Sequence, residues 1–157
     1  MKFIILILLF CKIVFASNYL FLVEEYNKEL ELEAKIISKI ASNSLHKDVK
    51  IFIPQLEDKE KKIYSKIVAL ANNCDESNFV FVKRANLKKE CNLTNKIFFT
   101  NDYKKLLKED KYIGAFFWSK SRPNIVFVKN RLEKNKVTLP NDFNQYIEDF
   151  KWKIHYF

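Results

Sequence analysis

The chain has little glycine, proline or histidine. Of its 157 residues, one is glycine, three are proline and two are histidine. A phosphate-cradling loop or a dinucleotide-binding turn needs several glycines, so a single glycine excludes both. A Ser-His-Asp arrangement needs an imidazole beside the serine. His46 stands at the end of an expected helix and His155 near the C-terminus. Neither follows a buried strand, so we do not expect histidine-based catalysis.

Acidic side chains define no clear catalytic group. The first expected strand ends in Ile-Pro-Gln at residues 53–55, without the acidic cluster that would hold magnesium in a phosphate-accepting receiver domain. Most of the 19 acidic residues stand at helical surface spacing among lysines, where solvated ion pairs are usual. Nevertheless, 19 acidic residues are enough to supply a catalytic carboxylate pair, so a secreted, carboxylate-based hydrolase stays open as an alternative. We expect no bound metal and no cofactor.

Apolar residues make up 48% of the chain and aromatic residues 15%, which is ample for one domain with a substantial core. The formal net charge is +9. Because the lysines are spread along the chain and not gathered into a patch, we expect a basic surface without a nucleic-acid partner.

The first sixteen residues resemble a secretory signal. Met1 and Lys2 precede the apolar run at residues 3–10, and Val14 and Ala16 suit the positions that a signal peptidase reads. We expect cleavage after Ala16, giving a periplasmic domain at residues 17–157. The alternative is a retained membrane anchor, but the uncharged run is far shorter than the roughly 20 residues that a span needs. We therefore expect no stable membrane span after cleavage.

Export leaves two cysteines in the mature chain, Cys74 and Cys91, because Cys11 departs with the signal. An even pair in an oxidising compartment favours a structural disulfide. Their spacing is not that of a redox pair, and two thiols without clustered histidines make a poor zinc site. Two separate buried thiols are the alternative.

Apolar spacing in the mature chain alternates between helical and strand patterns. Apolar residues at steps of three and four predict amphipathic helices. Short continuous apolar runs predict strands, and the runs at 79–82 and 97–99 are of the kind that is buried on both faces of a parallel sheet. Thr100, Asn101 and Asp102 supply helix-starting side chains, and Pro140 begins a last helix. The expected helices cover residues 27–45, 59–71, 103–109 and 140–150, with single turns at 85–91 and 130–134. The expected strands cover 49–53, 79–82, 97–99, 112–118 and 123–128, and residues 137–139 are expected to be extended.

The connection between the strands at 112–118 and 123–128 is too short for a crossover helix, so these two strands should form an antiparallel hairpin. The pattern predicts a single three-layer α/β/α domain whose sheet is mostly parallel, with this hairpin at one end. The lone glycine, Gly114, lies inside the first hairpin strand. A glycine there usually marks a bulge or a close backbone approach, so we expect no room for a large side chain.

Two groups of residues are candidate binding sites. Ligands of open α/β sheets meet the carboxyl ends of parallel strands, where Lys83, Arg84 and Asn101 would favour an anion if they converge. Two solvated cations at a strand end are the alternative. The second group is the hairpin loop, where Lys120 and Arg122 would stand beside the aromatic ring of Trp118.

Tryptophan and arginine are enriched among binding hot spots, so the hairpin loop is the better candidate contact surface. The alternative is that Trp118 belongs to the core and that the loop is a solvated turn.

The export signal, the amphipathic helix at 27–45, the alternating strands and helices and the pair Cys74 and Cys91 together resemble the small periplasmic YfiR-like proteins. Members of that family restrain a membrane-bound diguanylate cyclase by binding its periplasmic part. The resemblance lies in the order of elements, and the Trp-Pro near the family's first helix is absent here. It implies a non-enzymatic regulator and assigns no functional residue.

The leading hypothesis is a non-catalytic periplasmic regulatory or sensor domain. It would bind a small ligand or the ectodomain of an envelope protein such as a sensor kinase or a diguanylate cyclase. A periplasmic module that binds an anion or another solute is the first alternative, and the carboxylate-based hydrolase is the second.

Overall fold

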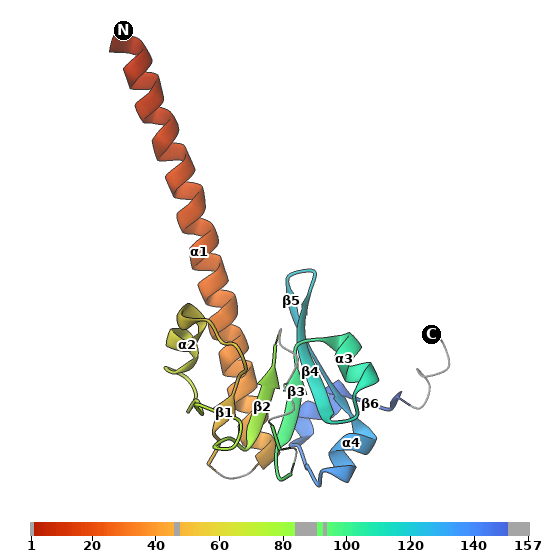
Figure 1. Cartoon of the computed structure of the whole chain (residues 1–157). Helices are drawn as coiled ribbons and strands as arrows, with labels where there is room; N and C mark the ends of the chain where they lie inside the picture. The colour runs from red at the N-terminus through yellow and green to blue at the C-terminus, as the bar shows by residue number, and fades with distance from the viewer. Residues whose placement is uncertain (1, 46–47, 84–90, 93, 151–157) are drawn as a thin grey trace.

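The computed structural model describes residues 2–45, 48–83, 91–92 and 94–150, with side chains from residue 24 onward. Figure 1 shows the arrangement of its elements. In chain order they are α1 (Lys2–Leu45), β1 (Ile51–Phe52), α2 (Asp58–Tyr64), β2 (Phe79–Val82), β3 (Ile97–Thr100), α3 (Tyr103–Lys108), β4 (Tyr112–Ser119), β5 (Arg122–Val128), α4 (Lys129–Lys134), η1 (Asn141–Tyr146) and β6 (Ile147–Glu148).

The strands form one six-stranded sheet in the order β1-β2-β3-β4-β5-β6. All neighbouring strands pair in parallel except β4 and β5, which are antiparallel. This confirms the expected α/β fold with a mostly parallel sheet and one antiparallel hairpin. The hairpin is not the outermost element, because the two residues of β6 pair with Phe127 and Val128 of β5.

Helix α1 covers one face of the sheet with its C-terminal half, and its N-terminal half extends away from the rest of the domain (Figure 1). The expected apolar stripe of this helix is confirmed: Leu30, Ala34, Ile37, Ile40 and Ala41 are all buried in the core cluster beneath it. That cluster also contains phenylalanines of β2, β3, β4 and β5. In the described part of the chain, no helix combines the length and apolar character needed to cross a membrane.

The opposite face of the sheet carries a second core cluster. It includes Val80 of β2, Phe98 of β3, Val126 of β5, Leu106 of α3 and Phe150. Alternate residues of β2 and β3 therefore point into different clusters, which explains why both strands are buried at every position. Helix α3 is only six residues long, and the expected three-layer arrangement stays a prediction.

A bulge in β4 explains why a glycine occupies position 114. The register with β3 shifts between the pairs Phe98–Tyr112 and Phe99–Gly114, so that β4 has an extra residue at this point. A Cβ atom on Gly114 would lie 2.5 Å from the carbonyl oxygen of Val126 and 2.5 Å from the ring of Phe99. Because one of these neighbours is backbone, there is no room for a side chain, as expected.

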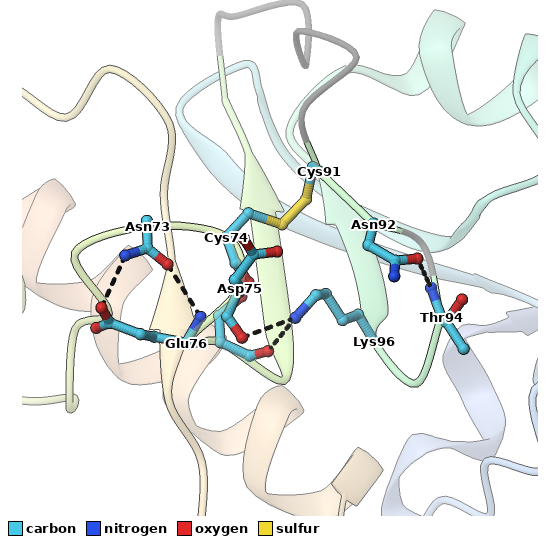
Figure 2. Close-up of a disulfide and its surroundings, with 9 residues drawn as sticks. Asn73, Cys74, Asp75, Glu76, Cys91, Asn92, Thr94 and Lys96 are labelled. Atoms are coloured by element: carbon cyan, nitrogen blue, oxygen red, sulfur yellow. Dashed lines mark hydrogen bonds between the residues drawn. A yellow bond between two sulfur atoms is a disulfide. The ribbon is translucent and has the colours of Figure 1, made fainter.

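Cys74 and Cys91 form the expected disulfide, with their Cα atoms 5.5 Å apart (Figure 2). The bond joins the segment before β2 to the segment before β3. Lys96 strengthens the same region, because its ammonium donates hydrogen bonds to the carbonyls of Ser77, at 2.7 Å, and Asp75, at 3.3 Å. The connection between two neighbouring parallel strands is therefore held by a covalent bond and by a lysine. The single turn expected at residues 85–91 and the candidate residue Arg84 lie outside the described residues, except for Cys91.

The helix expected at residues 59–71 is shorter than predicted, because α2 ends at Tyr64. The reason is a competing set of backbone hydrogen bonds with β1. The amide of Ile51 donates to the carbonyl of Ala69 at 2.9 Å, and the amide of Ala71 donates to the carbonyl of Ile51 at 2.9 Å. Apolar spacing alone did not reveal that this segment turns back to pair beside β1.

The prediction of a last helix that begins at Pro140 was also wrong. The chain forms a 3-10 helix, η1, and then the short strand β6. The apolar residues Phe143 and Ile147 suit either structure, but Ile147 and Glu148 pair with the otherwise open edge of β5. Tertiary pairing thus overrides helical spacing.

Arg131 of α4 is a buried structural cation. Its guanidinium donates hydrogen bonds to the carbonyls of Leu106, Glu109 and Tyr112 at 2.7, 3.2 and 3.0 Å, and to the carboxylate of Asp110 at 2.8 Å. Those carbonyls lie at the end of α3 and the start of β4, where a helix leaves its last carbonyls without partners. Arg131 therefore secures the α3–β4 connection.

Candidate functional site

The carboxyl ends of β2 and β3 lie side by side, as the parallel sheet requires. Asn101 follows β3 and donates its backbone amide to the carbonyl of Val82 at 3.1 Å. The hydroxyl of Thr100 donates to the same carbonyl at 3.0 Å. Lys83 follows Val82 directly, so Lys83 and Asn101 stand at the same edge. Both line an open hollow of about 610 Å³ together with Tyr103 and Phe117.

Lys83 is not a solvated cation, because its side chain is only 8% exposed. Its ammonium lies 2.7 Å from a carboxylate oxygen of Glu33 in α1 and 2.8 Å from one of Glu60 in α2. The hydroxyl of Tyr64 donates to the same oxygen of Glu33 at 2.6 Å. We call these four residues, Glu33, Glu60, Tyr64 and Lys83, the buried charge cluster. It joins α1, α2 and the end of β2.

The helical spacing places the two glutamates of the buried charge cluster. Glu33 lies between Leu30 and Ile37 on the buried stripe of α1, with exposure of 5%. Glu60 precedes buried Tyr64 by one turn on the inner face of α2, and it also accepts a hydrogen bond from the amide of Glu57 at 3.2 Å. The sequence signal for this cluster is a glutamate at a position of the helix where the spacing predicts an apolar residue.

The carboxylates of Glu33 and Glu60 shift the pKa values of the groups beside them. Burial opposes the charged form of Lys83, but the attraction and hydrogen bonds of Glu33 and Glu60 outweigh it and raise the pKa of the ammonium. Burial, together with the charge of Glu33, also raises the pKa of the Tyr64 hydroxyl. At neutral pH Lys83 is therefore charged and Tyr64 is neutral.

This arrangement changes what Lys83 can do. An anion at the strand ends would have to compete with Glu33 and Glu60 for the ammonium. The start of α3 is also occupied, because the carboxylate of Asp102 accepts hydrogen bonds from the amides of Lys104 and Lys105 at 2.8 and 3.2 Å. The structure thus places Lys83 and Asn101 at the same edge of the sheet, but the ammonium of Lys83 is held by the carboxylates of Glu33 and Glu60. The alternative interpretation of Lys83 as a solvated cation was wrong.

The hairpin tip is as short as the sequence indicated. Ser119 pairs with Arg122, which leaves a loop of Lys120 and Ser121. Both loop residues have positive φ, at 50° and 57°. Two-residue hairpin loops of this kind match the twist of the strands, although they usually contain Asn and Gly. The tip projects beyond the rest of the sheet (Figure 1).

Trp118 connects the tip to the core. Its ring packs at nearly a right angle on the ring of Phe116, with 5.7 Å between centroids, and it is half-buried against the α1-side core. Lys120 and Arg122 are exposed beyond it. Neither forms an ion pair within the described residues. We call the three candidate residues Trp118, Lys120 and Arg122 the hairpin tip. Because Arg122 pairs with Ser119, whereas Trp118 pairs with Pro123, Arg122 and the ring of Trp118 lie on opposite faces of the hairpin, and the expectation that they stand side by side was wrong.

A groove of about 460 Å³ begins below the hairpin tip. Residues 123–125 of β5 form one wall, and Ile36, Lys39 and Ile40 of α1 form another. The third wall is η1, through Phe143 and Tyr146. The sequence did not indicate this groove, because its walls come from three distant segments.

Chemically, the described residues offer binding surfaces. No group of three or more histidine, cysteine or acidic side chains in the described residues is placed to hold a metal ion. Glu33 and Glu60 lie close together, but both are buried and share Lys83. Solvated cations and a fixed aromatic ring occur together at the hairpin tip.

Comparisons with protein-family models, with curated proteins and with solved structures found no match to this chain. The fold and the disulfide define it as an α/β domain with a six-stranded sheet and one covalent cross-link.

Proposed function

We propose that the chain is an exported, non-catalytic regulatory domain that binds an envelope protein through the hairpin tip. The observation that carries the proposal is the tip itself: Lys120 and Arg122 are exposed at a two-residue turn that follows the half-buried Trp118, and within the described residues they form no ion pair. A preformed surface loses little entropy on binding. Tryptophan and arginine are both enriched among binding hot spots.

The order of elements supports a regulatory role. The resemblance to the YfiR-like proteins would make the partner the periplasmic part of a membrane protein such as a diguanylate cyclase or a sensor kinase. The disulfide is consistent with an oxidising compartment. In this proposal residues 1–16 are the export signal and the mature domain begins at Ser17.

Capture of the partner from an envelope extract tests the proposal. The double variant Lys120→Ala, Arg122→Ala should change the free energy of unfolding by no more than about 0.5 kcal/mol, because both side chains are exposed. It should nevertheless lose the partner that the wild-type protein retains, and raised salt should weaken the wild-type interaction in the same way.

The matched control is Lys61→Ala, Lys62→Ala, which removes two exposed cations from α2. It should retain the partner. If a folded hairpin variant captures the partner as well as the control does, the hairpin tip is not the contact surface.

Export is tested separately by the intact mass of the protein from the cell envelope. Removal of residues 1–16 is the expected result. A mass that includes the N-terminal segment would favour the retained anchor instead.

A further inference from the structure

A glycosylation motif lies in the connection between β2 and β3. Asn92, Leu93 and Thr94 match the pattern Asn-x-Ser/Thr, in which the middle residue is any except proline. No other asparagine of the chain is followed two positions later by serine or threonine. In exported proteins this pattern marks a surface loop whose asparagine accepts an oligosaccharide. The proposed function makes no use of the motif.

Both side chains that define the motif are on the surface. Asn92 and Thr94 are exposed. The side-chain oxygen of Asn92 accepts a hydrogen bond from the backbone amide of Thr94 at 3.0 Å, so a local turn brings the two residues together (Figure 2). The side-chain nitrogen of Asn92, the atom to which a sugar is attached, donates no hydrogen bond among the described residues. Attachment there would therefore break no hydrogen bond of the described structure.

The disulfide ties the motif to the amino ends of two strands. Cys91 directly precedes Asn92 and is bonded to Cys74, and Lys96 donates a hydrogen bond to the carbonyl of Ser77 at 2.7 Å. The motif thus lies near the starts of β2 and β3. Because β3 and β4 are parallel, this edge of the sheet is opposite to the end of β4, where the hairpin tip begins. An oligosaccharide on Asn92 would leave the hairpin tip uncovered.

We propose that Asn92 is the acceptor of an N-linked oligosaccharide. The donor is an oligosaccharide carried on a polyprenyl diphosphate, and a membrane transferase presents it. The side-chain nitrogen of Asn92 forms a bond to the anomeric carbon of the first sugar. The bond between that carbon and the diphosphate oxygen breaks, polyprenyl diphosphate leaves, and the nitrogen gives up one proton to a base of the transferase.

The transferase recognises the motif by its polar groups. The hydroxyl of Thr94 is the group that the pattern requires. The sequence also places the acidic Glu90 two positions before Asn92, a charge that a transferase can read in addition to the hydroxyl. The inference rests on the export that the proposed function includes, because the transfer takes place outside the cytoplasm.

The test uses the protein purified from the cell envelope of its own host. After reduction and alkylation, trypsin cleaves behind Lys89 and Lys96 and releases residues 90–96 as one peptide. In the mass spectrum, this peptide should carry the added mass of an oligosaccharide, and fragmentation should place that mass on Asn92.

Four variants expressed in the same host separate the motif from the loop around it. Asn92→Gln should lose the modification because it removes the acceptor. Thr94→Ala should also lose it although the acceptor is still present, whereas Thr94→Ser keeps the hydroxyl and should stay modified. All three leave the backbone amide of residue 94 in place. Asn95→Gln changes an exposed asparagine outside the motif and should stay modified.

An unmodified peptide 90–96 would overturn the inference. If residues 1–16 have been removed from that same protein, export stands and only the glycosylation fails. Sugar that remains on Asn92→Gln, or equal modification of Thr94→Ala and Thr94→Ser, would also overturn it, because the attachment would then follow another residue or another rule. Capture of the envelope partner through the hairpin tip is measured separately and does not depend on any of these results.

Discussion

Lys83 and Lys120 each follow an apolar strand, yet their surroundings are opposite. Lys83 ends β2 inside the protein, between the carboxylates of Glu33 and Glu60. Lys120 follows β4 at the hairpin tip and faces solvent without an ion pair in the described residues. The difference arises from the neighbouring elements, because α1 and α2 close over the end of β2 whereas the hairpin extends past them.

Lys83 is thus a cation that stabilises the fold, whereas Lys120 is a cation that is exposed to a partner. Removing one member of a buried ion pair leaves an uncompensated charge, whereas an exposed lysine contributes little to stability. Residue type and position after a strand are therefore not enough to assign a binding role. The surroundings of the ammonium decide it.

The largest expected effect is on Lys83. Lys83→Met should lower the free energy of unfolding by about 3–5 kcal/mol, because Glu33 and Glu60 would stay buried without their cation. Lys120→Met is the matched change at the hairpin tip and should cost no more than about 0.5 kcal/mol. Urea denaturation of both variants measures the difference.

A further variant tests the reason. Replacing Glu33 and Glu60 by Gln in the Lys83→Met background removes the buried charges, and most of the lost stability should return. If Lys83→Met is as stable as Lys120→Met, the buried charge cluster does not hold the two helices to the sheet.

The disulfide should have the next largest effect. Cys74→Ser with Cys91→Ser should lower the free energy of unfolding by about 3 kcal/mol, because the cross-link restricts the unfolded chain. The same loss should follow from a reductant in the wild-type protein. An unchanged urea midpoint under reducing conditions would show that the cross-link does not contribute to stability.

Gly114 tests the middle of the sheet, where β4 pairs with β3 on one side and with β5 on the other. Gly114→Val should lower the free energy of unfolding by about 1–3 kcal/mol, because its side chain would collide with the carbonyl of Val126 and the ring of Phe99. Ser119→Val, in the same strand but exposed, is the control and should change it by no more than about 0.5 kcal/mol. Equal melting temperatures for the two variants would show that the bulge can open.

The smallest expected effect is on how the free energy of unfolding depends on alkaline pH. The folded state raises the pKa of Lys83 and of Tyr64, so their contribution is complete below the unfolded values near pH 10 and declines above them. The free energy of unfolding should fall above about pH 10, by up to about 1.4 kcal/mol per pH unit for each proton. Tyr64→Phe should reduce that slope, whereas Lys120→Met should leave it unchanged. A slope that Tyr64→Phe does not alter would contradict the assignment.

Local patterns predicted much of the fold. The apolar stripe of α1 follows from helical spacing, and β2 and β3 follow from continuous apolar runs. The two-residue hairpin loop follows from the short connection between its strands. The role of Gly114 also follows from its place inside an apolar strand. Each of these conclusions depends on residues that are near one another in the sequence.

The predictions that were wrong depend on distant residues. The end of α2 is set by hydrogen bonds of Ala69 and Ala71 with Ile51. The pairing of Lys83 with Glu33 and Glu60 joins three elements, so neither the strand end nor either helix predicts it alone. Glu33 and Glu60 do interrupt apolar stripes, and that interruption is the signal that sequence reasoning can use.

The strand order has a consequence for how the chain assembles. Each strand lies beside the strand that precedes it in the sequence, from β1 to β6. A chain that emerges N-terminus first during synthesis would therefore deliver every strand after its partner has emerged. The disulfide joins the segment before β2 to the segment before β3, so it can close before β3 and the later strands have emerged. Because each strand pairs with the one before it, the sheet can grow by one strand at a time as the chain emerges.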